Sequence, residues 1–501
     1  MAAEPTPWSL RLLAAGTILA SVALLILSDG NLLAALMPSL VLALGVTLLR
    51  LPFPTVAAAA VLVALLVDDV RARPYMGLWE SPLFAPGRFV YDALDKITGV
   101  PGLKVFGVEL MFLVLLALLL LTLLGSRQAL PAPPRVFARA ALIAVAAVLL
   151  LELWGLVRGG NLRYSMLQMR PMLLTGLGSL ILGYAAPQAR NARLLLAVVV
   201  IAAVVRSLVG LYFWSVVVGG ADPEALEMGG GRYLMTHADT VLLVVALLIC
   251  LSTLVAWPTR AALLLNVAVT PLLSLVLVLN NRRLAFVSLG LSLLVMYALL
   301  QGPLRRRVNQ LALALVPIAA LYLVAGWNAQ GLWAKPVISV RSLLSGEDAS
   351  ASMRTIENYN LVHTARKNPV LGSGFGHEYD EVSQAFSIET YLEAYRYMPH
   401  NSLLWLVSVG GVVGFSMFWW LLVVGVFLAA LVQRHARTAL DLVVAQSGIA
   451  AIITYGIQCF GDMGMQSWLS IVVLITLLGL VASRATALEV WPEPHPGRRG
   501  A

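Results

Sequence analysis

Long apolar runs recur from one end of the chain to the other, and short polar segments separate them. Many runs are close to the ~20 residues that an α-helix needs to cross a hydrocarbon core ~30 Å thick. A β-barrel would instead show short segments of alternating polarity. The pattern therefore predicts an all-α polytopic membrane protein with about fourteen transmembrane helices. They are expected at 9–28, 32–50, 52–67, 105–124, 137–157, 171–186, 194–218, 239–256, 261–280, 284–301, 309–326, 401–431, 440–459 and 467–484.

Two longer polar segments interrupt the spans at 68–104 and 327–400, and the second is a large, partly helical loop. Loops of such length in compact proteins are usually functional. In it, "ASMRTIENYNLVHTARK" and "EYDEVSQAFSIETYLEAYRY" predict helices, and "VLGSGFG" between them predicts a tight glycine turn. The predicted divisions are N-terminal transmembrane helices at 1–200, transmembrane helices with arginine-bearing outer ends at 201–326, the loop at 327–400, C-terminal transmembrane helices at 401–485 and a disordered tail at 486–501.

The composition agrees with this class, since 60% of the residues are apolar and only 12% are charged. The net charge of +9 could indicate a nucleic-acid partner, but its distribution argues against one. If the spans alternate, most arginines of the short loops fall on one side and most acidic residues on the other. Basic loops stay in the cytoplasm, so both termini are predicted to be cytoplasmic and the two polar segments to lie outside.

Cys250 and Cys459 lie within or at the end of apolar runs, where cysteine behaves as a small hydrophobic residue. The sequence contains no CxxC pair and no Cys/His cluster. It therefore indicates neither a disulfide framework nor a zinc site.

The stretch "PHNSLLWLVSVGGVVG" begins with polar residues where the large loop meets a span. A histidine at a membrane interface is more often a polar anchor than a catalyst. Counted at 100° per residue, Gly411 lies within about 20° of His400 on the helix, and Gly414 lies about 40° to the other side. Small residues on one face let another helix or a lipid chain approach closely. Because histidine suits proton transfer near neutral pH, His400 is the candidate catalytic residue.

Five arginines depart from the cytoplasmic pattern, namely Arg282, Arg283, Arg354, Arg232 and Arg206. The first two begin a span at its outer end, where snorkelling to the interface is the structural alternative. Arg354 lies in the large loop, where it could instead pair with Glu357 on a solvated helix face. Arg206 lies in mid-span, where an ionisable residue is a functional candidate by default. Its structural alternative is an ion pair with a carboxylate such as Glu109 or Glu152.

Several outward arginines beside a lipid-accessible groove suit a lipid-linked diphosphate, because guanidinium groups bind phosphate oxygens with a permanently charged fork. A histidine close by could deprotonate an incoming hydroxyl group. Together they predict glycosyl transfer, with the acceptor activated on one side and the diphosphate leaving group stabilised on the other.

These residues carry a resemblance to the O-antigen ligase and polymerase superfamily. His400-Asn401, followed after nine residues by Gly411 and after two more by Gly414, resembles the family pattern H-[NSQ]-x9-G-x-x-[GTY]. "RKNPVLGSGFG", with Pro369, Gly372 and Gly374, is similar to the N-P-x-x-G-x-G segment of the family's large periplasmic loop. "NNRRLAFVSLGLSLLV" resembles its arginine-led span, and "GGGRYLMTHADTVLL" is similar to its loop-to-span entry. The resemblance covers roughly residues 200–485.

The resemblance implies a GT-C-like inverting glycosyltransferase at the periplasmic face of the bacterial inner membrane, which is metal-independent and needs no other cofactor. Its donor would be a glycan on undecaprenyl diphosphate, and its acceptor a second lipid-linked glycan (polymerase) or lipid A–core (ligase). A protein acceptor also occurs in the family. His400 would activate the acceptor hydroxyl or bind the diphosphate, and Arg282 or Arg283, with Arg354, would bind the diphosphate. Arg232 and Arg206 are weaker matches. Membrane lipid, a chain-length regulator and other polysaccharide-assembly proteins are candidate partners.

Two departures favour a polymerase of O-antigen or exopolysaccharide over a ligase. The chain has about fourteen predicted spans where ligases usually have about twelve, and Asn-Arg-Arg where ligases more often show Ser-Arg-Gly. The competing class is a transporter or flippase of the lipid-linked glycan, whose polar residues would gather near the midplane on broken, paired helices. Only Arg206 favours it. A structural membrane protein would not require the residues around His400 at all.

Overall fold

The computed structural model describes residues 7–72, 75, 78–100, 104–125, 130–218, 234–257, 259–329, 331–338, 341, 349–384 and 393–491. Over these residues the chain is all-helical, and the one β-type pairing is an isolated bridge between Ala93 and Phe106. The α-helices are α1 (Pro7–Leu27), α2 (Leu32–Leu49), α3 (Phe53–Leu66), α4 (Phe84–Tyr91), α5 (Leu94–Thr98), α6 (Gly107–Gly125), α7 (Arg135–Val157), α8 (Leu162–Leu182), α9 (Ala189–Tyr212), α11 (His237–Ala256), α12 (Arg260–Asn280), α13 (Arg283–Leu299), α14 (Gly302–Gly326), α16 (Ala349–Lys367), α17 (Ser402–Arg434), α18 (Ala439–Gly461) and α19 (Trp468–Ala487).

Every predicted span coincides with one of these helices, and the chain is a polytopic helical membrane protein. Ten helices of the described residues are long and apolar enough to cross a membrane. The predicted spans that fall short of this test belong to α1, α8, α13 and α14. α13 has only 17 residues, and α14 begins with the charged run Arg305–Arg307. A count of fourteen spans therefore stays a prediction.

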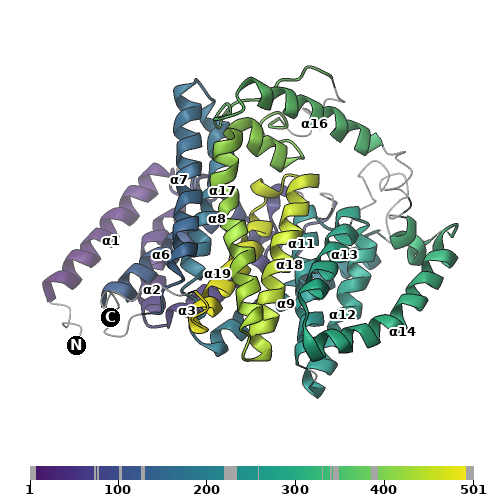
Figure 1. Cartoon of the computed structure of the whole chain (residues 1–501). Coiled ribbons are helices and arrows are strands. Elements are labelled where there is room, and N and C mark those ends of the chain that lie inside the picture. The colour runs from purple at the N-terminus through teal and green to yellow at the C-terminus, as the bar shows by residue number, and fades with distance from the viewer. Residues whose placement is uncertain are drawn as a thin grey trace, which may run out of the picture.

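The centre of the molecule is formed by α17, α18, α19 and α11 (Figure 1). Burial of the apolar window is 94% in α19 and 83% in α18, against 6% in α2. The pair α1 and α2 flanks this centre on one side, and α12, α13 and α14 flank it on the other (Figure 1). Side chains on the flanking helices are apolar and exposed, as expected where lipid rather than protein covers them.

The predicted helix at "ASMRTIENYNLVHTARK" is confirmed as α16, which lies across the N-terminal end of α17 (Figure 1). The helix predicted at 378–397 is wrong at both described ends, which are turns and irregular backbone. The amide of Tyr379 donates to the carbonyl of Arg396 at 3.1 Å, and Arg396 forms an ion pair with Glu378 at 2.6 Å. These contacts hold the two ends side by side, so one continuous helix cannot join them. Its middle, 385–392, lies outside the described residues, as do 492–501 of the predicted tail.

The glycine turn after α16 and the glycines of α17 form one interlocked unit. Gly411 has φ +56° and ψ −166°, so α17 is two helical pieces joined at a kink. The amides of Val412 and Val413 donate to the carbonyls of Pro369 and Val370 at 2.9 and 3.1 Å. In return, the amide of Gly374 donates to the carbonyl of Val409 at 2.8 Å. The turn thus supplies partners for backbone groups that the kink releases.

This unit corrects the expectation of a smooth face running from His400 down the helix. The count of 100° per residue holds only for a continuous helix, and the kink interrupts it at Gly411. A Cβ on Gly411 would lie 2.3 Å from the carbonyl carbon of Val370, and one on Gly372 would lie 2.3 Å from that of Val409. Gly414 admits Leu151 of α7. The glycines therefore accept a backbone turn and a neighbouring helix, not a lipid chain.

Alanine at Gly411 is expected to destabilise the protein by about 3 kcal/mol or more, because this backbone region is essentially restricted to glycine and the added Cβ meets backbone atoms. The free energy of unfolding in detergent would measure the effect. Gly456→Ala is the matched control, since nothing lies within 4 Å of its added Cβ. Equal losses in both variants would contradict the interlocked unit.

Candidate functional site

A cavity of about 570 Å³ lies among segments that are far apart in the sequence. Its walls come from the segment after α3, the first turn of α8, the residues that lead into α11 and α13, the segment before α17, and the turn from α18 to α19. Charged and polar side chains on these walls include Arg71, His237, Arg282, Gln458 and Asp462.

His400 is held between α16 and α17 by a carboxylate. Its backbone amide donates to Glu357 Oε2 at 3.1 Å, and its Nδ1 lies 3.3 Å from Glu357 Oε1. Asn401 begins α17 as the N-cap, because its Oδ1 accepts from the amide of Leu404 at 3.1 Å. With Nδ1–H donated to Glu357, the neutral ring presents Nε2 as its basic atom.

The hydrogen bond with Glu357 is the main cause that raises the pKa of His400 above its ordinary value. Burial acts in the opposite direction, as does the positive charge of Arg354. The side chain is still 29% exposed, so His400 can exchange protons with a molecule outside the protein.

Arg282 reaches the cavity and contacts a second histidine there. Its Nη1 lies 2.6 Å from His237 Nε2, and its Nη2 donates to the carbonyl of Met235 at 3.3 Å. On the other side of the ring, His237 Nδ1 lies 3.2 Å from Asp462 Oδ2. Arg354 and His400 both lie within electrostatic range of His237, so the two predicted arginines and both histidines share one region.

Of the other arginines predicted to bind the diphosphate, those among the described residues do not lie with Arg282 on the cavity wall. Arg283 is the first residue of α13 and does not line the described cavity. Arg354 is half-buried on α16, and its predicted partner Glu357 bonds His400 instead. Arg232 lies outside the described residues.

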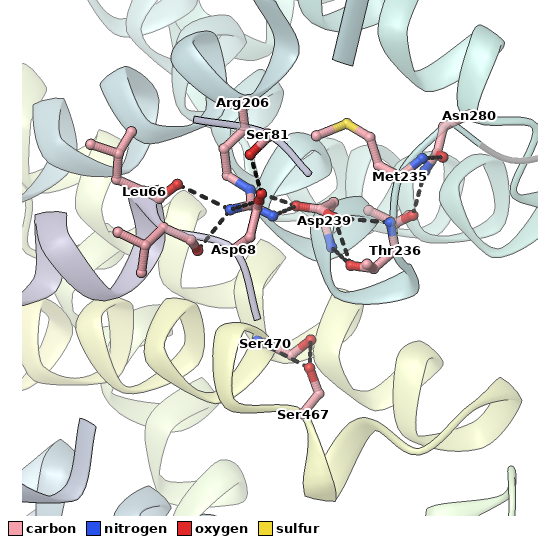
Figure 2. Close-up of polar contacts among 12 residues, drawn as sticks. Leu66, Asp68, Ser81, Arg206, Met235, Thr236, Asp239, Asn280, Ser467 and Ser470 are labelled. Carbon is pink, nitrogen blue, oxygen red and sulfur yellow. Dashed lines mark hydrogen bonds and ion pairs between the residues drawn. The ribbon is translucent and has the colours of Figure 1, made fainter. Parts of the chain in front are cut away.

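Arg206 does not line the cavity. It lies in a buried ion-pair network (Figure 2). Its side chain is 2% exposed. Nε donates to Asp239 Oδ1 at 2.6 Å, Nη1 lies 3.1 Å from Asp68 Oδ1, and Nη1 also donates to the carbonyls of Leu66 and Val67 at 3.0 and 2.8 Å. The guanidinium therefore hydrogen-bonds one carboxylate and two carbonyls, and forms an ion pair with a second carboxylate.

The carboxylates named as structural partners of Arg206 were the wrong ones. Glu109 lies 3.6 Å from Arg170, and Glu152 accepts from the hydroxyl of Ser165 at 2.8 Å. Asp68 and Asp239 sit at the ends of neighbouring helical segments, and the sequence gives no spacing that links either of them to Arg206.

Sequence reasoning did not name Arg71, His237, Glu357 or Asp462 as site residues. Arg71 lines the cavity, pairs with Asp69 at 3.3 Å and lies 4.8 Å from the ring centre of Phe106. The signal that selected the other arginines, a positive charge in an outer segment, applies to it as well. His237 and Asp462 each stand at the end of a span. For Asp462 that position is the one signal, whereas His237 also lies in "GGGRYLMTHADTVLL", the stretch similar to the family's loop-to-span entry.

Chemically, the region offers an imidazole whose basic nitrogen is available, and arginines that can bind an anion. Within the described part of the chain, His, Cys, Asp and Glu form no group of three or more that could hold a metal ion.

Comparison with known proteins finds a family match for part of this region. Residues 268–419 match the family model described as O-antigen ligase. The matched segment contains Arg282, Arg354, the turn at 368–374 and His400. No curated protein matches the chain. The resemblance is therefore confirmed over this segment, and the chain is a multi-helix membrane protein with a segment that matches the O-antigen ligase family model.

Proposed function

We propose that this protein is a glycosyltransferase that moves a glycan from undecaprenyl diphosphate to a hydroxyl acceptor, as a polymerase of O-antigen or exopolysaccharide. The observation that carries the proposal is the meeting of His400 and Arg282 in one region. Both belong to the matched segment, Arg282 lines the cavity, and His400 stands two residues after Met398, which also lines it.

His400 acts as the base in this proposal. Its Nε2 takes the proton of the acceptor hydroxyl as that oxygen attacks the anomeric carbon, and the bond from that carbon to the diphosphate oxygen breaks. One displacement of this kind inverts the anomeric configuration. Arg282, with Arg354 nearby, stabilises the negative charge that develops on the leaving diphosphate. The arginines thereby supply the positive charge without a metal. The alternative role of His400 is to bind the diphosphate.

Two observations bear on the competing functions. The number of spans no longer favours a polymerase, because the ten candidate spans of the described residues match neither fourteen nor twelve. The sequence Asn281-Arg282-Arg283 is the feature that still favours a polymerase over a ligase acting on lipid A–core. Arg206 is the one residue that favours a transporter, and its four protein partners account for its buried charge. Transport is therefore the weaker candidate.

The proposed location is the bacterial inner membrane, with both termini in the cytoplasm. α16 and His400 would then face the periplasm, where lipid-linked glycans are presented. A chain-length regulator, or another polysaccharide-assembly protein, is the proposed kind of protein partner.

A reconstituted transfer reaction tests the proposed function. Purified protein would be mixed with an undecaprenyl-diphosphate oligosaccharide, with and without lipid A–core, and the products separated on a gel. A ladder from the lipid-linked substrate alone supports the polymerase, and one shifted product that needs lipid A–core supports the ligase. If neither lane contains product while vesicles with the protein translocate the substrate, the proposal is replaced by transport.

Glu357→Gln is expected to move the acidic limb of the pH profile of kcat/KM to lower pH. Glu357 raises the pKa of His400, so its removal lets the ring stay neutral, and able to accept a proton, under more acidic conditions. Glu378→Gln is the control, because Glu378 pairs with Arg396 at 2.6 Å in the outer loop. A limb that stays in place, or moves to higher pH, would argue against His400 as the base.

A further inference from the structure

We propose that His237 is a positioning residue that holds Arg282 in the orientation needed to bind the donor's diphosphate. The inference rests on the proposed function, in which Arg282 makes that contact. It assigns to His237 a neutral ring that links the carboxylate of Asp462 to the guanidinium of Arg282. All three side chains line the same cavity.

The hydrogen-bonding capacities of the three groups allow one arrangement. Arginine carries only donors, so the 2.6 Å contact from Arg282 Nη1 requires His237 Nε2 to be the acceptor. The ring proton must then lie on Nδ1, which faces Asp462 Oδ2 at 3.2 Å. A proton on Nε2 would instead oppose the N–H groups of Arg282. The geometry therefore selects one neutral tautomer of His237.

The backbone that carries His237 is fixed on both sides (Figure 2). Thr236 caps α11 by accepting from the amide of Asp239, and the carboxylate of Asp239 is bound by Arg206. The amide of Met235 donates to Asn280 Oδ1 at 2.7 Å, and the carbonyl of Met235 accepts from Arg282. His237 is the first residue of α11, and the contacts of its neighbours hold the start of this helix in place. The imidazole therefore has little freedom to move with Arg282 and can act as a fixed support for it.

Asp462 connects this support to the helix of the proposed base. Gln458 Nε2 donates to Asp462 Oδ2 at 3.0 Å, which leaves the carboxylate oriented towards the ring. The carbonyl of Asp462 accepts from the hydroxyl of Ser402 at 3.1 Å, and Ser402 is the first residue of α17. A continuous chain of contacts therefore runs from the start of α17 through Asp462 and His237 to Arg282. It sets the separation between the acceptor's base and the donor's diphosphate.

Binding of undecaprenyl diphosphate to the full-length protein in detergent tests the role of His237. His237→Leu removes the acceptor for Arg282 and is expected to weaken binding about tenfold, the value of one charge-assisted hydrogen bond. His237→Gln keeps an acceptor oxygen and should retain most of the affinity. In an Arg282→Ala background, His237→Leu should cause no further loss, because it acts through Arg282. His435→Leu, on an exposed residue whose Nδ1 lies 3.0 Å from the Leu431 carbonyl, is the control.

Two outcomes of the binding measurement would overturn the inference. Equal and additive losses in both backgrounds would show that His237 binds or folds independently of Arg282, and a normal affinity in His237→Leu would show that Arg282 needs no support. If His237→Leu unfolds, the affinity of His237→Gln for undecaprenyl diphosphate is compared with that of the wild type. The unfolding temperature of each protein shows whether it is folded. If the wild type fails to bind undecaprenyl diphosphate although it transfers glycan, this inference fails alone. If it neither binds nor transfers, the proposed function fails with it.

Discussion

Alanine at His400 is expected to lower kcat for glycan transfer by about 10²- to 10⁴-fold, the contribution of a positioned general base. The imidazole takes part only as the acceptor oxygen attacks, so its loss should raise the barrier without weakening the binding of the donor. The KM for the undecaprenyl-diphosphate glycan should therefore stay within a factor of about two.

Initial rates with purified variants over a range of donor concentrations would separate the two constants. His363→Ala is the matched control, since His363 lies on α16, the helix that supplies Glu357, and does not line the cavity. Its variant should transfer glycan at nearly the normal rate. If His400→Ala, inserted normally in the membrane, kept full activity, the base would have to be sought elsewhere. A large rise in KM at an unchanged kcat would instead make His400 a ligand of the diphosphate.

The helices could be predicted because a membrane imposes one rule on every span, the internal satisfaction of the backbone in an apolar solvent. That rule does not predict where a helix ends when the helix extends beyond the hydrocarbon core of the membrane. α8 begins at Leu162, nine residues before the predicted span at 171–186, and its first turn carries Arg163 and Tyr164. Those polar residues reduced the apolar signal, yet they line the cavity.

The two glycine motifs illustrate what local sequence can and cannot supply. Both were recognised as unusual, and both contain residues with positive φ, including Gly372 and Gly411. Their mutual hydrogen bonds could not be predicted, because a turn and a kink that satisfy each other's backbone look like two independent breaks in the sequence. The sequence therefore predicts a helix or a lipid chain beside these glycines, whereas the backbone of Val370 lies against Gly411 and a helix side chain, Leu151, lies against Gly414.

The candidate site was predicted in its chemistry but only partly in its members. His400 and Arg282 stood out because a titratable or permanently charged group at a span's outer end is rare. Glu357 derives its interest from His400, and His237 and Asp462 derive theirs from each other and from Arg282. Each of these contacts joins residues 43 or more positions apart in the chain. One sequence contains no periodicity that relates such distant positions, so their grouping required the fold.

Leucine at Arg206 is expected to destabilise the protein by about 3–5 kcal/mol, since it leaves the buried carboxylates of Asp68 and Asp239 without their counter-charge. Lysine would keep the charge but could not reach the four acceptors that the planar guanidinium serves, so Arg206→Lys should lose an intermediate amount. Arg163→Leu is the control. That arginine is 69% exposed and lies 3.4 Å from Glu393, and an exposed pair is worth about 1 kcal/mol or less.

The free energy of unfolding, measured by titration with a denaturing detergent, would give these differences, and a second measurement tests what the network supports. Asp239 joins Arg206 to the capped start of α11, so folded Arg206→Lys protein should bind undecaprenyl diphosphate more weakly than the wild type. That loss should disappear in an Arg282→Ala background, because the displaced α11 acts on the diphosphate through His237 and Arg282.

A stability loss below about 1 kcal/mol in Arg206→Leu would show that the buried carboxylates are neutral without their partner. In that case hydrogen bonds alone, without ion pairs, would hold the helix ends in place. Arg206→Lys protein should then bind undecaprenyl diphosphate as tightly as the wild type.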